Sequence, residues 1–140
     1  MPSANVALAS SIYAAWARGD FASVGWADSE IEFAIVGGPD PGSWKGLRGM
    51  AQGWHGWLAA WDAYEAEAEE YRELDDQRVL VLGRMGGRGK TSGMSVKTEF
   101  ANLLNIRDGK VTRLVLYSNR DRALADLGLA PQGKAADAPR

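Results

Sequence analysis

The stretch GSWKGLRGMAQGWHGWLAAW, Gly42 to Trp61, holds four of the six tryptophans in the chain. It predicts a loop that leads into an amphipathic helix, because its large apolar side chains recur at helical spacing. That stripe comprises Met50, Trp54, Trp57, Leu58 and Trp61. A buried indole supplies a large apolar surface and an N–H group that needs a partner. The helix is therefore expected to form either part of a packed core or one side of a ligand cavity.

The composition around this stretch limits the chemistry of the protein. The chain has 140 residues, enough for one domain that buries roughly two-thirds of its unfolded surface. It has no cysteine and a single histidine, His55. These counts exclude a disulfide framework and a thiolate or histidine-rich metal site within one chain. We expect no metal and no other cofactor.

The net charge and the hydropathy of the chain limit the kinds of binding partner and the cellular location that we expect. The net charge is −2, and no basic run is present, which argues against electrostatic binding of nucleic acid. No apolar stretch is long enough to span a bilayer, and the N-terminus lacks the features of a signal peptide. We expect a cytoplasmic protein that binds neither membrane nor nucleic acid.

Upstream of the tryptophan-rich stretch, the pattern predicts two helices and a strand. Ser3 can cap a helix that runs to about Arg18 and carries Trp16 on its apolar stripe. Asp20 is a candidate cap for a short second helix that carries Trp26. Strict alternation from Glu30 to Val36 then predicts the first strand.

Downstream, the chain is predicted to be mainly β structure. Strands are expected at residues 65–69 and 78–84, and the glycine-rich run Gly86 to Gly93 is interpreted as a hairpin connection, since it lacks phosphate-loop spacing. The turn Asp108-Gly109 between alternating apolar runs predicts a second hairpin. A short helix over Asp121 to Leu127 closes a single domain of residues 1–130, and residues 131–140 are expected to form a disordered polar tail.

These elements predict the α+β class, with about three N-terminal helices gathered against a mainly antiparallel sheet and a short C-terminal helix. Several strands are apolar on both faces, whereas the helices can cover only one face. An exposed apolar sheet face of that size favours association, so a homodimer through the outer face is expected. A strongly coiled sheet that closes over itself is the alternative.

The order of several short motifs is similar to that of a known family. These motifs are ARGD, ADSEIEF, the glycine-rich loop into WKGLRG, RDGKV and SNRDRALADLGL. The succession, over residues 5–130, resembles the SnoaL-like family of the nuclear transport factor 2-like superfamily, which includes relatives of ketosteroid isomerases and polyketide cyclases. The resemblance implies a curved sheet wrapped around helices as a cone with a pocket at one end, commonly in dimers. It implies no single activity, because this fold hosts enzymes and binding modules.

The acids that such relatives use are absent from the matching positions. The general base of ketosteroid isomerases would fall at Ala34, and the aspartate of SnoaL cyclases at Leu116 or Ser118. The resemblance places a first-helix tyrosine near Ile12 or Tyr13. It places an acidic hydrogen-bond donor near Asn102, whose amide can still donate.

Glu32 is the candidate general base that remains, if its face of the first strand is turned to the pocket. A carboxylate among tryptophans has a raised pKa, which suits proton transfer near neutral pH. The alternative is a solvated Glu32, because Ile31, Phe33 and Ile35 form the more apolar face. Asn102 is the second catalytic candidate, and it either faces a ligand or holds backbone.

The remaining candidates form a predicted ligand-binding set drawn from apolar stripes, with Arg84 and His55 as its polar members. The set comprises Trp16, Trp26, Trp54, His55, Trp57, Leu82, Arg84, Phe100, Leu104, Leu114 and Leu116. Many apolar side chains with a few polar groups are typical of cavities for small apolar or aromatic molecules. We therefore expect a small-molecule-binding protein, with acid/base cyclase or isomerase chemistry as one possibility and a non-catalytic binding or dimeric assembly module as the other.

Overall fold

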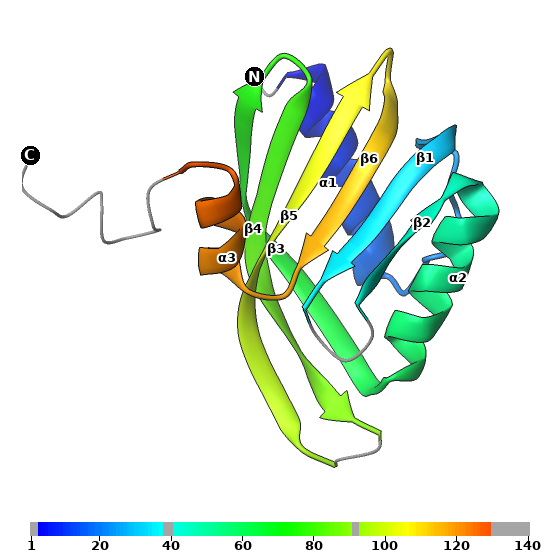
Figure 1. Cartoon of the computed structure of the whole chain (residues 1–140), viewed down its shortest axis with the longest axis vertical. Coiled ribbons are helices and arrows are strands. Elements are labelled where there is room, and N and C mark those ends of the chain that lie inside the picture. Colours follow the sequence, from blue (N-terminus) through cyan, green and yellow to red (C-terminus); the bar gives the residue numbers. More distant parts are fainter. Residues whose placement is uncertain (1–2, 38–40, 91–92, 130–140) are drawn as a thin grey trace, which may run out of the picture.

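The computed structural model describes residues 3–37, 41–90 and 93–129 and shows three helices and one six-stranded, curved and unclosed sheet (Figure 1). In chain order the elements are α1 (Ala4–Ala17), β1 (Ala27–Val36), β2 (Gly42–Lys45), α2 (Gly46–Ala59), β3 (Trp61–Asp75), β4 (Arg78–Gly89), β5 (Ser95–Arg107), β6 (Lys110–Tyr117) and α3 (Arg120–Asp126). The strand order is β2-β1-β6-β5-β4-β3, and only β1 and β6 pair in parallel. The α+β class and the mainly antiparallel curved sheet are confirmed.

The first helix forms as predicted, and the short second helix does not. The Ser3 hydroxyl accepts a hydrogen bond from the Val6 N–H and caps α1. Residues 20–26 form an irregular loop that ends in a turn at Gly25 and Trp26, and no helix. The Asp20 carboxylate does accept the N–H groups of Ala22 and Ser23, but it closes a local turn. Phe21, Val24 and Trp26 pack against the inner cluster from this irregular segment, so their burial does not require a helix.

The tryptophan-rich stretch divides into three elements rather than two. Its first residues form β2, an edge strand that the sequence did not predict, in which Trp44 pairs with Phe33 of β1. The helix α2 follows, with Trp54 and Trp57 buried. Trp61 lies beyond the helix and begins β3. Of the predicted helical stripe, the residues up to Leu58 therefore lie on α2 and Trp61 does not.

The hairpin predictions hold in the described residues. Asp108 and Gly109 adopt positive φ angles of 52° and 76° and join β5 to β6. The strand β4 continues to Gly89, so the predicted connection Gly86 to Gly93 is shorter than expected, and residues 91–92 lie outside the described part.

Apolar side chains fill both sides of the sheet, and α3 provides the cover on the outer side. The inner cluster packs α1 and α2 against the sheet. On the outer side, Ala123 and Leu124 of α3 pack against Leu82, Leu103 and their strand neighbours, which are almost completely buried. The predicted closing helix is therefore present, shifted by one residue toward the N-terminus. The predicted tail, residues 131–140, lies outside the described residues, and the division of the chain at residue 130 stays a prediction.

Candidate functional site

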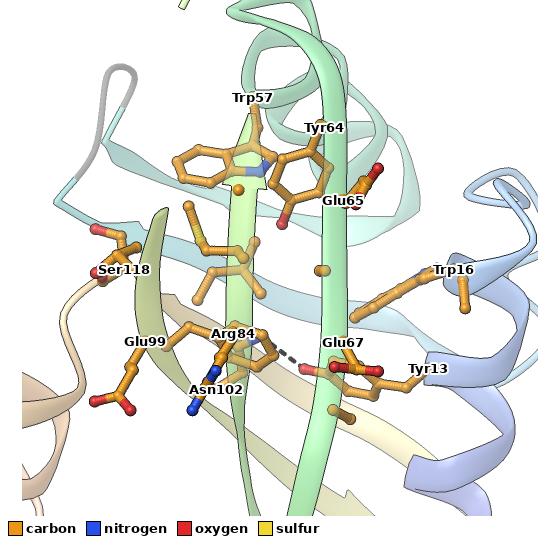
Figure 2. Close-up of a pocket in the computed structure, with 18 of the residues that line it drawn as sticks. Tyr13, Trp16, Trp57, Tyr64, Glu65, Glu67, Arg84, Glu99, Asn102 and Ser118 are labelled. Atoms are coloured by element: carbon orange, nitrogen blue, oxygen red, sulfur yellow. Dashed lines mark hydrogen bonds between the residues drawn. The ribbon is translucent and has the colours of Figure 1, made fainter. Parts of the chain in front are cut away.

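A cavity of about 1010 Å³ lies between α1, α2 and the inner side of the sheet, and Figure 2 shows residues that line it. Aromatic rings form most of its apolar boundary. The lining aromatic residues are Tyr13, Trp16, Phe21, Trp54, Trp57, Tyr64, Tyr71, Phe100 and Tyr117. This composition is typical of a site for a small apolar molecule.

Rings from three elements pack against one another in this lining, edge to face between α1 and α2 and stacked between α1 and β5. The ring centroid of Trp16 lies 4.6 Å from that of Tyr13 and 4.9 Å from that of Trp54. Tyr13 also stacks on Phe100 at 6.2 Å. Such pairs contribute about 0.5–1.5 kcal/mol each beyond the area they bury, so they stabilise the aromatic boundary of the cavity.

A hydrogen-bonded pair supplies the polar part of the interior. Asn102 Nδ2 donates to the hydroxyl oxygen of Tyr13 at 2.7 Å, and Asn102 Oδ1 accepts the Tyr117 N–H at 3.2 Å. A backbone N–H can only donate, so the atom that faces it must be the amide oxygen. This contact fixes the amide orientation. The Tyr13 oxygen is then an acceptor from Asn102, and its own proton is free for another group.

Burial keeps Tyr13 neutral. Loss of solvation raises the pKa of the Tyr13 phenol far above its ordinary value of 10.0, and the hydrogen bond from Asn102 only partly opposes this. At physiological pH, Tyr13 is therefore a neutral hydrogen-bond donor and not a base.

At the opposite end of the view in Figure 2, Trp57 and Tyr64 lie side by side. Burial raises the pKa of the Tyr64 phenol, and the nearby Trp57 indole lowers it in part. No hydrogen bond of normal geometry joins the two, and Trp57 Nε1 is buried without a partner. An unpaired buried N–H costs free energy, and this nitrogen has no accessible surface, so in this conformation it belongs to the packed wall behind the cavity and not to its surface.

Charged residues of the cavity lining lie on its solvent side. They are Glu65, Glu67, Arg84, Lys97 and Glu99, and all are exposed. Arg84 Nε lies 3.2 Å from a carboxylate oxygen of Glu69. The buried part of the lining thus consists of neutral polar groups and aromatic rings, whereas its charged side chains are exposed to solvent.

The structure brings seven of the predicted site residues to the cavity. These are Trp16, Trp54, Trp57, Arg84, Phe100, Asn102 and Leu116. Of them, Arg84 is largely solvent-exposed, with 69% of its side chain accessible. The sequence left open whether Asn102 bonds to the backbone or faces the cavity, and the structure shows both. Its amide oxygen accepts a backbone N–H, and its amide nitrogen donates to Tyr13, a residue of the cavity lining.

The other predicted residues lie outside the lining. Leu104 and Leu114 are fully buried core residues, and Leu82 lies beneath α3 on the outer face. His55 is exposed on α2. Trp26 packs against Trp16, and its indole donates to the Ser23 carbonyl in its own turn.

Glu32 also lies away from the cavity. It is exposed on β1, where its neighbours in register are Lys45 on β2 and Arg113 on β6. Ile31, Phe33 and Ile35 take the inner face and are buried. The simple alternation of the strand therefore decided its orientation, and the placement of the Glu32 carboxylate in the pocket is corrected.

The sequence did not single out Tyr64, Tyr71 or Met85, which also line the cavity. Tyr13 was named only as a possible match to a family position. Tyr64 and Tyr71 lie on β3 among acidic residues, where the glutamates dominate the pattern. Alternation with Ala66 and Ala68 was the available signal, since these small residues share the inner side.

Among the described residues, no three acidic or histidine side chains gather as a metal site would require. No helix in the same part of the chain is both long and apolar enough to cross a membrane.

The model of the SnoaL-like domain matches residues 9–114. The chain belongs to the SnoaL-like domain family. Three solved structures have the same fold as this SnoaL-like chain. An NTF2-like protein from Burkholderia thailandensis E264 is 20% identical, with 94% of this chain and 100% of that chain covered and a TM-score of 0.75. TerC, crystallised with polyporic acid, is 20% identical over 89% and 98% of the two chains, with a TM-score of 0.69.

A proposed polyketide cyclase from Xanthomonas campestris pv. campestris is 19% identical over 87% of the SnoaL-like chain and 95% of its own, with a TM-score of 0.67. At such identities the likeness establishes the cone-like fold and not the activity. No curated protein matches the sequence. The function therefore has to be argued from the cavity.

Proposed function

We propose that this SnoaL-like protein binds a flat, largely apolar small molecule in its aromatic cavity. The observation that carries the proposal is a cavity of about 1010 Å³ whose buried lining is largely aromatic, with a few neutral polar groups inside and charged residues on its exposed side. The crystallisation of TerC with polyporic acid is consistent with a ligand of this kind in the same fold.

A titration followed by tryptophan fluorescence tests the proposal, because Trp16, Trp54 and Trp57 all line the cavity. Flavone and 2-acetylnaphthalene serve as flat, uncharged probes. We expect saturable quenching. Ala68→Phe places a ring in the cavity and should abolish it, whereas Ala51→Phe, on the exposed side of α2, should not. Absence of saturable quenching in the wild type for both probes would contradict the proposal.

Proton-transfer catalysis is the second candidate, and the Tyr13–Asn102 pair favours it. A neutral, oriented phenol can stabilise the negative charge that develops on a carbonyl oxygen when an adjacent proton is removed. Glu65 and Glu67 line the cavity and can accept such a proton, a role that the sequence had assigned to Glu32.

Solvent exchange measures this activity without knowledge of the substrate. The methyl protons of 2-acetylnaphthalene exchange with deuterium through the enolate, and proton NMR follows their loss in D₂O. We expect wild-type protein to accelerate the exchange and Tyr13→Phe to reduce that acceleration about 10- to 100-fold. Binding without any acceleration would identify a non-catalytic binding module.

A further inference from the structure

Tyr64 of β3 supplies a hydroxyl group to the end of the cavity that lies opposite Tyr13. Figure 2 shows this hydroxyl pointing from β3 toward the space between the lining residues, beside Trp57. The Tyr64 ring packs edge to face against Trp57 and tilted against Trp61, with ring centroids 6.0 and 6.2 Å away. These contacts hold the ring in the wall of the cavity, while the hydroxyl faces its interior.

No acceptor among the described residues takes the proton of this hydroxyl. The polar group that lies against it is the Trp57 indole N–H, which can only donate. Within the described part of the chain, the side-chain polar atoms that are both buried and without a partner belong to Trp57, Trp61 and Asn105. The Tyr64 oxygen is not in that group, so it has accessible surface. A ligand in the cavity can therefore reach this hydroxyl, unlike the Trp57 nitrogen.

The surroundings of Tyr64 favour a neutral ligand group. Burial raises the pKa of the Tyr64 phenol, so at physiological pH the group keeps its proton and acts as a neutral donor. Every charged residue of the described lining is exposed to solvent, so the buried part holds no cation that could compensate an anionic ligand group. Transfer of a carboxylate from water into such surroundings costs far more free energy than transfer of a carbonyl.

We propose that Tyr64 determines specificity: its phenol donates a hydrogen bond to a neutral acceptor oxygen, such as a carbonyl, at the end of a flat ligand that lies against Trp57. This specificity rests on the proposed function, since it requires that the cavity binds a ligand. An apolar group at that end leaves the Tyr64 donor without an acceptor. A carboxylate there loses its hydration without gaining a cation.

Three probes with the same ring system test the role of Tyr64. They are 2,6-diacetylnaphthalene, 2-acetyl-6-ethylnaphthalene and 6-acetyl-2-naphthoic acid, which share one acetyl group and carry a carbonyl, an apolar group or a carboxylate at the other end. Equilibrium dialysis at about pH 7, where the carboxylic acid is ionised, gives their affinities for the wild type, Tyr64→Phe and Trp61→Phe. Trp61→Phe is the matched control, because Trp61 packs against the Tyr64 ring but does not line the cavity.

The wild type should bind the diacetyl probe roughly 3- to 10-fold more tightly than the acetyl-ethyl probe, as expected for one hydrogen bond. In Tyr64→Phe this ratio of affinities should fall to less than about twofold, whereas Trp61→Phe should keep the wild-type ratio. A substitution that only disturbs packing changes the affinity for both probes together and leaves their ratio unchanged. The naphthoic acid should bind the wild type at least about 10-fold more weakly than the diacetyl probe.

Equal affinities of the wild type for the diacetyl and acetyl-ethyl probes, or a ratio that Tyr64→Phe leaves unchanged, overturn the role of Tyr64 while the cavity still binds. Equal affinities for the naphthoic acid and the diacetyl probe overturn the preference for a neutral group. Failure of the wild type to bind any of the three probes overturns the proposed function itself. Thermal unfolding shows that the variants are folded, and the wild-type ratio tests the proposal without any variant.

Discussion

The Arg120 guanidinium donates a hydrogen bond from Nη2 to the carbonyl oxygen of Gly83 at 2.8 Å. Its Nε reaches the Phe100 carbonyl at 3.4 Å, so the first residue of α3 is bonded to the backbones of two neighbouring strands. Carboxylates of Glu69 and Glu99 lie 3.8 and 3.6 Å from the same group. This buried arginine therefore attaches α3 to the outer face of the sheet.

Replacing Arg120 with Ala should destabilise the protein by about 2–3 kcal/mol, because two buried carbonyl oxygens lose a charged donor. Urea unfolding measures this change. Arg122→Ala is the control, since Arg122 makes an exposed pair with Asp126 on the same helix and should cost less than about 0.5 kcal/mol. Equal losses in the two variants would show that Arg120 has no special role.

Replacing Gly83 with Ala should be equally damaging for a steric reason. A Cβ at this position would lie 2.1 Å from the Glu67 carbonyl oxygen and 2.7 Å from the Phe100 ring. Overpacking of this kind costs roughly 1–3 kcal/mol or more. Gly25→Ala is the matched control, because a Cβ there meets nothing within 4 Å. A thermal melt of both variants that shows no difference contradicts the prediction.

The apolar outer face bears on the oligomeric state. The sequence predicted a homodimer to cover this face, but α3 already buries Leu82 and Leu103 within one chain. The homodimer stays a prediction, and light scattering tests it: we expect twice the mass of one chain, which is 15.1 kDa. Leu124→Asp should displace α3, expose the face and promote self-association. A wild type with the mass of one chain at high protein concentration would contradict the homodimer and would show that α3 alone covers the face.

Glu32→Gln should leave ligand affinity and any proton-exchange activity within about twofold of wild type, because a solvated strand-face residue has no contact with the cavity. Asn102→Leu should weaken the binding of carbonyl probes, since Tyr13 loses the amide that orients it. Calorimetric titration with 2-acetylnaphthalene compares the two. A large loss in Glu32→Gln alone would return the base role to this residue.

Tyr13 should make the protein sensitive to alkali. Its pKa is raised in the folded state by burial, so the protonated phenol is favoured there. Its contribution to stability is then complete below its ordinary value of 10.0 and decreases as the pH rises above it, because the unfolded chain ionises first. Urea unfolding at about pH 8 and about pH 11 should show a smaller alkaline loss in Tyr13→Phe than in wild type. An unchanged pH dependence would contradict the prediction.

Local signals in the sequence were sufficient for much of the fold. Asp108-Gly109 determines its own turn, and Ser3 caps α1 through a residue three positions away. The β2 strand was missed because its four residues form a strand only against Phe33 and its neighbours on β1. Edge strands this short have no periodicity of their own.

The candidate site was predicted less completely, because a cavity depends on contacts between distant elements. Asn102 was recognised from the apolar residues around it, but its partner Tyr13 lies 89 positions away. The orientation of Glu32 was predicted correctly by strand alternation and incorrectly by the family expectation. Strand alternation therefore predicted correctly which side chains of β1 are buried. The family resemblance alone did not predict correctly which face of β1 is turned to the cavity.

The parallel pairing of β1 with β6 also affects how the chain is made. Phe33 lies on the first strand in the sequence and pairs in register with Leu114 on the last strand. The pairing of β1 with β6 therefore forms only after most of the domain has been synthesised. Until then β1 can pair with β2 on one edge and pack α2 on its apolar inner face, but its other edge has no partner strand. The native partner of this edge of β1 is therefore one of the last parts of the domain to be synthesised.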